Sequence, residues 1–230
     1  MMQQVMAQIK DILLSQKCVA IFSHNNPDGD TLGSQLALAS ALGAAGIETI
    51  LLNNDAISEQ YNFVAGHDKI QPYRPELALP DVIIFVDCAS LELANCDAQS
   101  DFLQGKTIIN IDHHTSNQQY GTVNYVRGDA AANCQNIYEV IQGLGQEITP
   151  DIATALYMGL STDTGNFLFD NVSSQTLRIA ADLKDYGADT NSLRWYLYES
   201  CSQKRVELMK YILNELHISY NGQYAWSKLS

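Results

Sequence analysis

The sequence has little positive charge. Lys and Arg together number 13 against 26 Asp and Glu, which gives a formal net charge of −13 at pH 7. A surface of this sign repels polyanions at long range. Long duplex nucleic acid, which is bound through a basic surface, is therefore excluded as an expected partner. A small phosphate ester is still compatible with this charge as a ligand, provided that divalent cations neutralise the local carboxylates.

Long apolar runs and cysteine pairs are absent as well. No apolar run approaches the roughly 18 residues of a membrane helix, and the first ten residues lack the basic and apolar regions of a secretory signal. The five cysteines are scattered and include no CxxC pair, as in a protein kept reduced. We therefore expect a cytoplasmic protein with no membrane partner.

Short apolar runs alternate with helical patterns along the chain. Strands are predicted at Cys18–Phe22, Thr49–Leu52, Val82–Val86 and Thr107–Ile111, and helices at Gln3–Ser15, Thr31–Ala45, Ala131–Gln142, Thr149–Leu160 and Ser174–Tyr186. This alternation predicts an α/β fold with a doubly wound, mainly parallel sheet. The continuous hydrophobicity of the strands predicts flanking helices on both faces of the sheet. In such folds ligands bind beyond the carboxyl ends of the strands.

Acidic and imidazole residues follow four apolar segments. Asp112-His113-His114 comes directly after the run 107–111, where unpaired polar groups would each cost about 2–7 kcal/mol to desolvate. A metal ion removes this cost, because it takes carboxylate and imidazole as ligands. The other residues in equivalent positions are His24, Asp28 and Asp30 after Cys18–Phe22, Asp87 after Val82–Val86, and Asp163 after Ala155–Leu160.

These residue types fit a binuclear metal site. One tight loop can aim His24, Asp28 and Asp30 inward, and the helix predicted from Thr31 would point its N-terminus at the same place, which favours a phosphate. Imidazole and carboxylate ligands without thiolate fit Mn²⁺ best, with Mg²⁺, Co²⁺ and Fe²⁺ as alternatives. Two ions about 3.5–4 Å apart would activate a water for in-line displacement.

Each of these features has a simpler explanation when it is taken alone. A single Asp at a strand end is more often a turn or cap residue, and paired histidines can form a hydrogen-bonded turn. Cys88 could add a ligand, but a small buried packing residue is the commoner role. His67 and His217 stand alone and are expected to be structural or surface residues. The aromatic cluster Trp195, Tyr196 and Tyr198 is expected to pack at a domain junction rather than to stack on bases.

The motifs taken together resemble the DHH phosphoesterase superfamily. The matching segments are His24–Asp30 with Gly33-Ser34, Val86-Asp87, Asp112-His113-His114 and Thr162–Phe167, in that order. Within the superfamily the chain is most similar to the NrnA-type branch, whose members degrade very short RNA and dephosphorylate 3′-phosphoadenosine 5′-phosphate (pAp). The stretch from Ser174 through Gly187-Ala188-Asp189 is also similar to that branch.

The resemblance implies a role for each residue of the site. One metal would be held by His24, Asp28 and Asp87, and a second by Asp30, Asp87, His113 and Asp163, with Asp87 as the bridge. His114 would contact the scissile phosphate, and Asp112 would orient the histidines from behind. The catalytic residues would thus be His114, Asp112 and Asp87.

Two departures from the family pattern accompany the resemblance. The segment Ala132–Gln135 lacks the Ser or Thr and the Glu that the family often has, which puts the usual contacts there in doubt. The glycine-rich C-terminal substrate-binding domain is absent from the sequence. We expect residues 1–190 to form the catalytic domain, 191–216 linker helices, and 217–230 the beginning of a second domain whose Asn221-Gly222 pair predicts a hairpin. A C-terminal ribbon docked on the main domain is the alternative.

The sequence therefore predicts a manganese-dependent hydrolase of short oligonucleotides, dinucleotides or pAp, working by two-metal activation of water. Alternatives within the enzyme class are a cyclic-dinucleotide phosphodiesterase, an inorganic pyrophosphatase and a single-strand exonuclease, the last disfavoured by the lack of a basic channel. A metal-binding or nucleotide-sensing module without turnover is the alternative of a different class. A homodimer is one assembly that the sequence allows.

Overall fold

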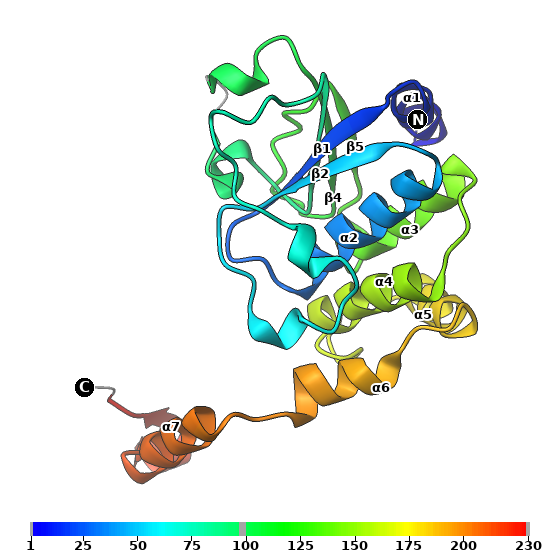
Figure 1. Cartoon of the computed structure of the whole chain (residues 1–230). Coiled ribbons are helices and arrows are strands. Elements are labelled where there is room, and N and C mark those ends of the chain that lie inside the picture. Colours follow the sequence, from blue (N-terminus) through cyan, green and yellow to red (C-terminus); the bar gives the residue numbers. More distant parts are fainter. Residues whose placement is uncertain (1, 97–99, 229–230) are drawn as a thin grey trace.

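The computed structural model describes residues 2–96 and 100–228 and is built on one parallel sheet (Figure 1). Its strand order is β2-β1-β3-β4-β5. The strands are β1 (Cys18–Ser23), β2 (Glu48–Leu52), β3 (Val82–Val86), β4 (Thr107–Asp112) and β5 (Val123–Val126). All four neighbouring pairs are parallel, so the predicted α/β class with a parallel sheet is confirmed.

The strand order reverses between β1 and β3, and this reversal creates the site. After β2 the chain crosses back over β1 to enter β3, so the connections from β1 and β3 leave in different directions. The register aligns the strand ends, because Ser23 pairs with Val86 and Val86 pairs with Ile111. The residues that follow these three therefore meet at one edge of the sheet.

Long helices cover one face of the sheet. These are α1 (Met2–Leu14), α2 (Gly29–Ala44) and α3 (Asn133–Leu144), with α4 (Pro150–Asp163) and α5 (Ser174–Asp185) behind them. Alternate strand residues such as Ile21 and Ile84 are fully buried against this layer. The close packing of α2 on α4 depends on a glycine, since a Cβ atom at Gly33 would lie 2.4 Å from the carbonyl oxygen of Ala155.

The other face carries short 3₁₀ helices instead of long helices. Phe22 and Phe85 stack there with their ring centroids 5.2 Å apart, and Phe102 packs on Phe22. The covering elements include η3 (Leu91–Ala94) and η4 (Asp101–Leu103), both within the connection from β3 to β4. Two further 3₁₀ helices, η1 (Glu59–Tyr61) and η2 (His67–Lys69), follow β2, and Tyr61 of η1 is buried in the core of the long-helix face instead. The helices expected on both faces are therefore present on the face of Phe22 and Phe85 only as single turns.

Most predicted elements lie within two or three residues of the observed ones. Helix α2 begins at Gly29 rather than Thr31, because the Asp28 side chain accepts hydrogen bonds from the first-turn amides and caps the helix. Helix α4 continues past the predicted end at Leu160 and reaches Asp163. Within the described residues, none of the helices combines the length and apolar character needed to cross a membrane.

The C-terminal segment, drawn from orange to red in Figure 1, forms an arm. It contains α6 (Thr190–Leu193), the π-helix η5 (Arg194–Glu199), α7 (Gln203–Asn214), β6 (His217–Ser219) and β7 (Tyr224–Trp226). Figure 1 shows α7 and the β6–β7 pair standing away from the sheet, and α7 buries none of its residues. The predicted hairpin is confirmed, with Ser219 paired to Tyr224, but Tyr220 belongs to the turn (η6, Tyr220–Gly222) rather than to the strand.

Candidate metal centre

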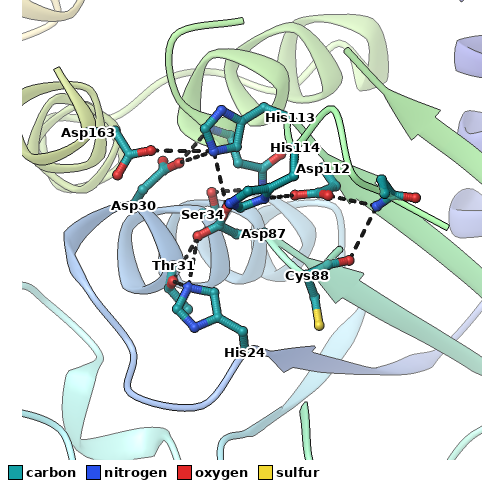
Figure 2. Close-up of polar contacts among 12 residues, drawn as sticks. His24, Asp30, Thr31, Ser34, Asp87, Cys88, Asp112, His113, His114 and Asp163 are labelled. Atoms are coloured by element: carbon teal, nitrogen blue, oxygen red, sulfur yellow. Dashed lines mark hydrogen bonds and ion pairs between the residues drawn. The ribbon is translucent and has the colours of Figure 1, made fainter. Parts of the chain in front are cut away.

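Side chains from five elements converge at the carboxyl edge of the sheet (Figure 2). His24 follows β1, Asp87 follows β3, Asp112 ends β4, and His113 and His114 come next. Asp28 and Asp30 lie at the start of α2, and Asp163 is the last residue of α4. The structure therefore brings together all the residues that the sequence predicted for the site: His24, Asp28, Asp30, Asp87, Asp112, His113, His114 and Asp163.

Asp87 lies at the middle of this cluster, with its two carboxylate oxygens facing different partners. Oδ2 lies 2.7 Å from the hydroxyl of Thr31 and 3.4 Å from Nε2 of His24. Oδ1 lies 3.5 Å from Nε2 of His113 and 3.7 Å from Nδ1 of His114. Asp87 is buried and has a left-handed backbone with φ of 51°, a conformation that costs a non-glycine residue energy and often marks a functional site.

His24, Asp28 and Asp87 form what we call the first ligand group. One ligand atom from each lies within 4.8 Å of the others. The hydroxyl of Thr31 joins the group, because it lies 3.1 Å from Oδ1 of Asp28 and also contacts Nε2 of His24. The sequence had suggested Thr31 only as a helix start, since nothing local shows where a helix hydroxyl will point.

Asp30, His113 and Asp163 form the second ligand group, which meets the same 4.8 Å criterion. Nε2 of His113 lies 3.3 Å from Oδ2 of Asp163 and 3.7 Å from Oδ2 of Asp30. Asp30 is completely buried and is held from behind by the start of α3, where Cys134 N–H donates to Oδ1 at 2.8 Å. Asn133 N–H donates to Oδ2, so Asp30 satisfies two of the amides that a helix start leaves free.

This contact answers the doubt raised by the segment Ala132–Gln135. Helix α3 has no side-chain cap of its own at Ala132, and the Asp30 carboxylate from α2 takes that place. Gly159 of α4 leaves room for it, because a Cβ atom there would lie 2.6 Å from Oδ1 of Asp30. The backbone amides of α3 therefore contact the site although the segment lacks the side chains that the family often has there.

His114 differs from His113 in its surroundings. Its side chain is 42% exposed, and its Nδ1 lies 2.8 Å from Oδ1 of the buried Asp112. Asn117 donates to the other oxygen of Asp112 at 2.6 Å, and Asn136 donates to the Asp112 carbonyl at 2.9 Å. Asp112 is thus fixed on several sides, and it fixes the ring of His114. Sequence reasoning missed Asn117, although it lies only a few residues beyond His114.

Carboxylates crowd the centre, and this crowding shifts the pKa values. Burial raises the pKa of Asp30, and the nearby carboxylates of Asp87 and Asp163 raise it further. Burial also raises the pKa of Asp163, with Asp87 as the next cause. Burial opposes the charged form of Asp87, but the neighbouring imidazoles of His113 and His24 outweigh it and lower the pKa of this carboxyl group.

The pKa values of the three histidines are raised by the neighbouring carboxylates. Burial disfavours the charged ring of His24, but Asp87 outweighs burial and raises the pKa of His24 to about 9. The same balance, with Asp87, Asp30 and Asp163 as partners, raises the pKa of His113. For His114 the hydrogen bond to Asp112 is the main cause of a raised pKa. The cluster therefore attracts positive charge.

Two buried atoms at the centre lack a hydrogen-bond partner among the described residues. They are Oδ1 of Asp87 and Nε2 of His113, which face each other across 3.5 Å. Buried polar atoms are rarely left unpaired in native proteins, and those that are often contact a bound ion or water. Unpaired ligand atoms, crowded carboxylates and a donor set of oxygen and imidazole nitrogen all fit divalent metal ions.

The other candidates of the sequence analysis lie outside the cluster. The Cys88 side chain is buried in the core of the opposite sheet face, and its Sγ donates to the carbonyl of Ser90 at 3.0 Å, as expected for a packing residue. Burial raises the pKa of the Cys88 thiol to about 12. His67 binds the carbonyl of Val64, and the ring of His217 stacks on Trp226. Both are therefore structural, as predicted.

Comparisons with known proteins place this geometry in a family. The family described as "DHH family, N-terminal domain" matches residues 18–160. The bifunctional oligoribonuclease and PAP phosphatase NrnA of Thermus thermophilus is 36% identical over 170 residues, which cover 74% of this chain and 50% of that protein. The protein of the same name from Bacillus subtilis is 29% identical over 207 residues, covering 89% of this chain and 64% of that protein.

A solved structure has the same fold. The crystal structure of an exopolyphosphatase-related protein from Bacteroides fragilis superposes with a TM-score of 0.87 at 23% identity, covering 94% of this chain and 66% of that one. The chain spans about half the length of the Thermus thermophilus relative and somewhat more of the others. The predicted resemblance to NrnA-type proteins is confirmed, and the chain belongs to the DHH family.

Proposed function

We propose that this chain is the catalytic part of a metal-dependent phosphoesterase that acts on short oligonucleotides, dinucleotides or pAp. The observation that carries the proposal is the placement of Asp87, whose Oδ2 faces the first ligand group and whose Oδ1 faces the second. A carboxylate with one oxygen toward each of two ligand sets is what a two-metal site needs as its bridge. The names of the NrnA relatives supply the substrate class.

The ligand assignment follows from the two groups. His24, Asp28 and Asp87 would hold one ion, and Asp30, Asp87, His113 and Asp163 would hold the other. We propose Mn²⁺ because of the mixed oxygen and imidazole donors, with Mg²⁺ or Co²⁺ as substitutes. When bound, two such ions supply Lewis-acid activation of a water and neutralise phosphate charge.

The protein's own residues hold the reacting groups in place. Asp112 binds Nδ1 of His114, which fixes the ring and favours its protonated form. His114 would then donate a hydrogen bond to the scissile phosphate and stabilise the charge that develops there. The start of α2, behind Asp28, turns its helix dipole toward the same place and favours an anion.

The exposed arm is the basis for the proposed division of the chain into domains. Residues 1–190 would be the catalytic domain, 191–216 the linker helices, and 217–230 the beginning of a substrate-binding domain. The exposure of α7 and of the β6–β7 strands supports this division, because a lone two-stranded hairpin is only marginally stable in water. A cytoplasmic location and a homodimer remain part of the proposal.

Product analysis tests the function. The protein would be incubated with Mn²⁺ and with a dinucleotide, pAp, pyrophosphate and bis-p-nitrophenyl phosphate, and the products separated by chromatography. We expect slow hydrolysis of the small activated diester, and less on dinucleotides, whose distant groups need further protein surface. Asp87→Asn, which keeps the size of the side chain, serves as the control and should be inactive. Hydrolysis of none of these by the metal-loaded protein, or equal rates for the control, would overturn the proposal.

A further inference from the structure

The arm contacts helix α4, which ends in Asp163, through its π-helix η5. The π-helix η5 carries a hydrogen bond from Ser200 N–H to the Trp195 carbonyl at 2.7 Å, which spans five residues rather than four. Such helices are rare and are frequently found at functional sites. The ring of Tyr196 stacks on Phe63 with centroids 5.2 Å apart, which fixes η5 on the main domain.

Tyr198 of the same helix reaches the end of α4. Its hydroxyl lies 2.6 Å from the hydroxyl of Ser161, and either atom can donate. It also donates to the Ser161 carbonyl at 3.2 Å. Ser161 is completely buried and stands two residues before Asp163, a member of the second ligand group.

The turn beyond Asp163 needs this support. Gly165, Asn166 and Phe167 follow one another with φ values of 56°, 58° and 64°. Two of these are not glycine, so the left-handed backbone persists only where the surroundings fix it. Ser161 provides part of that fixation, because its carbonyl accepts from Asn166 N–H at 2.7 Å and its hydroxyl lies 3.3 Å from Asn166 Oδ1.

Electrostatic interactions also disfavour a negative charge at the position of Asp163. The residue ends α4, where the helix dipole disfavours a negative charge. Its carboxylate is also repelled by the nearby carboxylates of Asp30 and Asp87. Both effects disfavour a charged Asp163 side chain in the cluster.

We infer that the Tyr198 hydroxyl is a positioning group that holds Asp163 in the second ligand group and thereby couples the arm to metal binding. This inference rests on the proposed two-metal function. Coupling of this kind is reciprocal, so metal binding should also fix η5. A merely structural role would stabilise the arm without any effect on the metal.

Metal titration tests the inference. Mn²⁺ binding would be followed by calorimetry in the wild type, Tyr198→Phe, Ser161→Ala and the double variant. We expect two ions in the wild type, and in each variant one ion with unchanged affinity and one bound about 3- to 10-fold more weakly, as expected for one lost hydrogen bond. The loss of affinity in the double variant should be smaller than the sum of the two single losses, since both variants remove the contact between the two hydroxyl groups.

Tyr196→Phe is the matched control. It removes a hydroxyl from the same helix while keeping the stacked ring, and no hydrogen bond of that hydroxyl is seen among the described residues. Both ions should bind it with wild-type affinity. Hydrogen exchange gives a second readout, because Mn²⁺ should slow exchange of the amides 195–200 in the wild type and in this control but not in Tyr198→Phe.

The outcomes separate the inference from the function on which it rests. A wild type that binds fewer than two ions overturns the proposed function and the inference with it. A wild type with two ions, together with a Tyr198→Phe variant of equal affinity and equal exchange, overturns only the inference, whatever its thermal stability. Should Tyr198→Phe fail to fold, Ser161→Ala removes the bond between the two hydroxyl groups from the other side, and wild-type affinity for both ions in that variant overturns the inference.

Discussion

The two ligand groups of the metal centre lie side by side but are supported differently. In the first group, Thr31 contacts His24, Asp28 and Asp87, so the protein itself satisfies many of the polar atoms. In the second group, Nε2 of His113 lies among carboxylates without a hydrogen bond from any described residue. The first group can therefore keep its arrangement without an ion. In the second group, the metal-free protein bears the free-energy cost of a buried polar atom that has no partner.

The largest effect should come from the residue that the two groups share. Asp87→Ala removes the proposed bridge, so metal content should fall at both groups and turnover should drop by several orders of magnitude. Elemental analysis and steady-state kinetics measure these quantities. The isosteric Asp87→Asn controls for the volume and the unusual backbone at this position. Full metal content with a wild-type rate in Asp87→Ala would show that Asp87 is no bridge.

The neighbouring histidines should separate metal binding from phosphate contact. His113→Ala should weaken binding at the second group, because the side chain lies among Asp30, Asp87 and Asp163. His114→Ala should leave metal content nearly intact and lower kcat, because the ring is half-exposed and fixed by Asp112.

Elemental analysis of the two variants decides between these roles. His114 also lies near enough to Asp87 and His113 to form a ligand set with them. Equal loss of metal from both variants would assign His114 to metal and contradict the division proposed above.

Raising the pH should widen the stability difference between metal-loaded and metal-free protein. In the metal-free fold the pKa of His24 is raised from 6.5 to about 9, so its stabilising charge is complete below pH 6.5 and lost as pH rises through about 9. The raised pKa of Asp163 acts in the same direction, because the folded state holds a proton that the unfolded chain has already lost. Metal binding must displace these protons, so affinity should increase with pH.

Thermal unfolding with saturating Mn²⁺ and with a chelator, between about pH 6 and pH 9, measures this difference. Buffers with different ionisation enthalpies would also report the number of protons released in calorimetry. A difference that narrows as pH rises would contradict a site in which His24 and Asp163 exchange protons for metal.

A smaller effect should appear in the metal-free protein alone. Asp163→Asn removes one carboxylate from the crowded second group, so it should stabilise the metal-free fold by about 1 kcal/mol. The same variant should lose most of the stabilisation that Mn²⁺ confers. Chemical denaturation with and without metal measures both quantities. Asp170→Asn, a change of the same kind at an exposed residue, should alter neither. A destabilised metal-free Asp163→Asn would show that crowding is not costly there.

The sequence predicted the site through features that are local. An apolar strand followed by Asp or His is visible in the chain itself, and a parallel sheet necessarily brings such strand ends together. Asp87 and Asp112-His113-His114 could therefore be assigned to one site from their positions in the sequence. The end of α4 was less certain, because the helix pattern stopped at Leu160 while the helix continues to Asp163.

The features that escaped prediction depend on contacts between distant parts of the chain. Asp30 caps α3 from 103 residues away, and Tyr198 binds Ser161 across 37 residues. Neither contact leaves a periodic signal in the sequence. Strand β5 (Val123–Val126) was missed because it is short and half-buried, so it lacks the continuous apolar character of the central strands. The one-turn helices on the second sheet face could not be located for a similar reason, since they have no pattern long enough to detect.

Anomalous diffraction from crystals grown with Mn²⁺ tests the central claim most directly. We predict two anomalous peaks about 3.5–4 Å apart, one beside His24 and Asp28 and the other beside Asp30, His113 and Asp163, with Asp87 between them. A single peak, or two peaks that do not share Asp87, would contradict a binuclear centre bridged by this carboxylate.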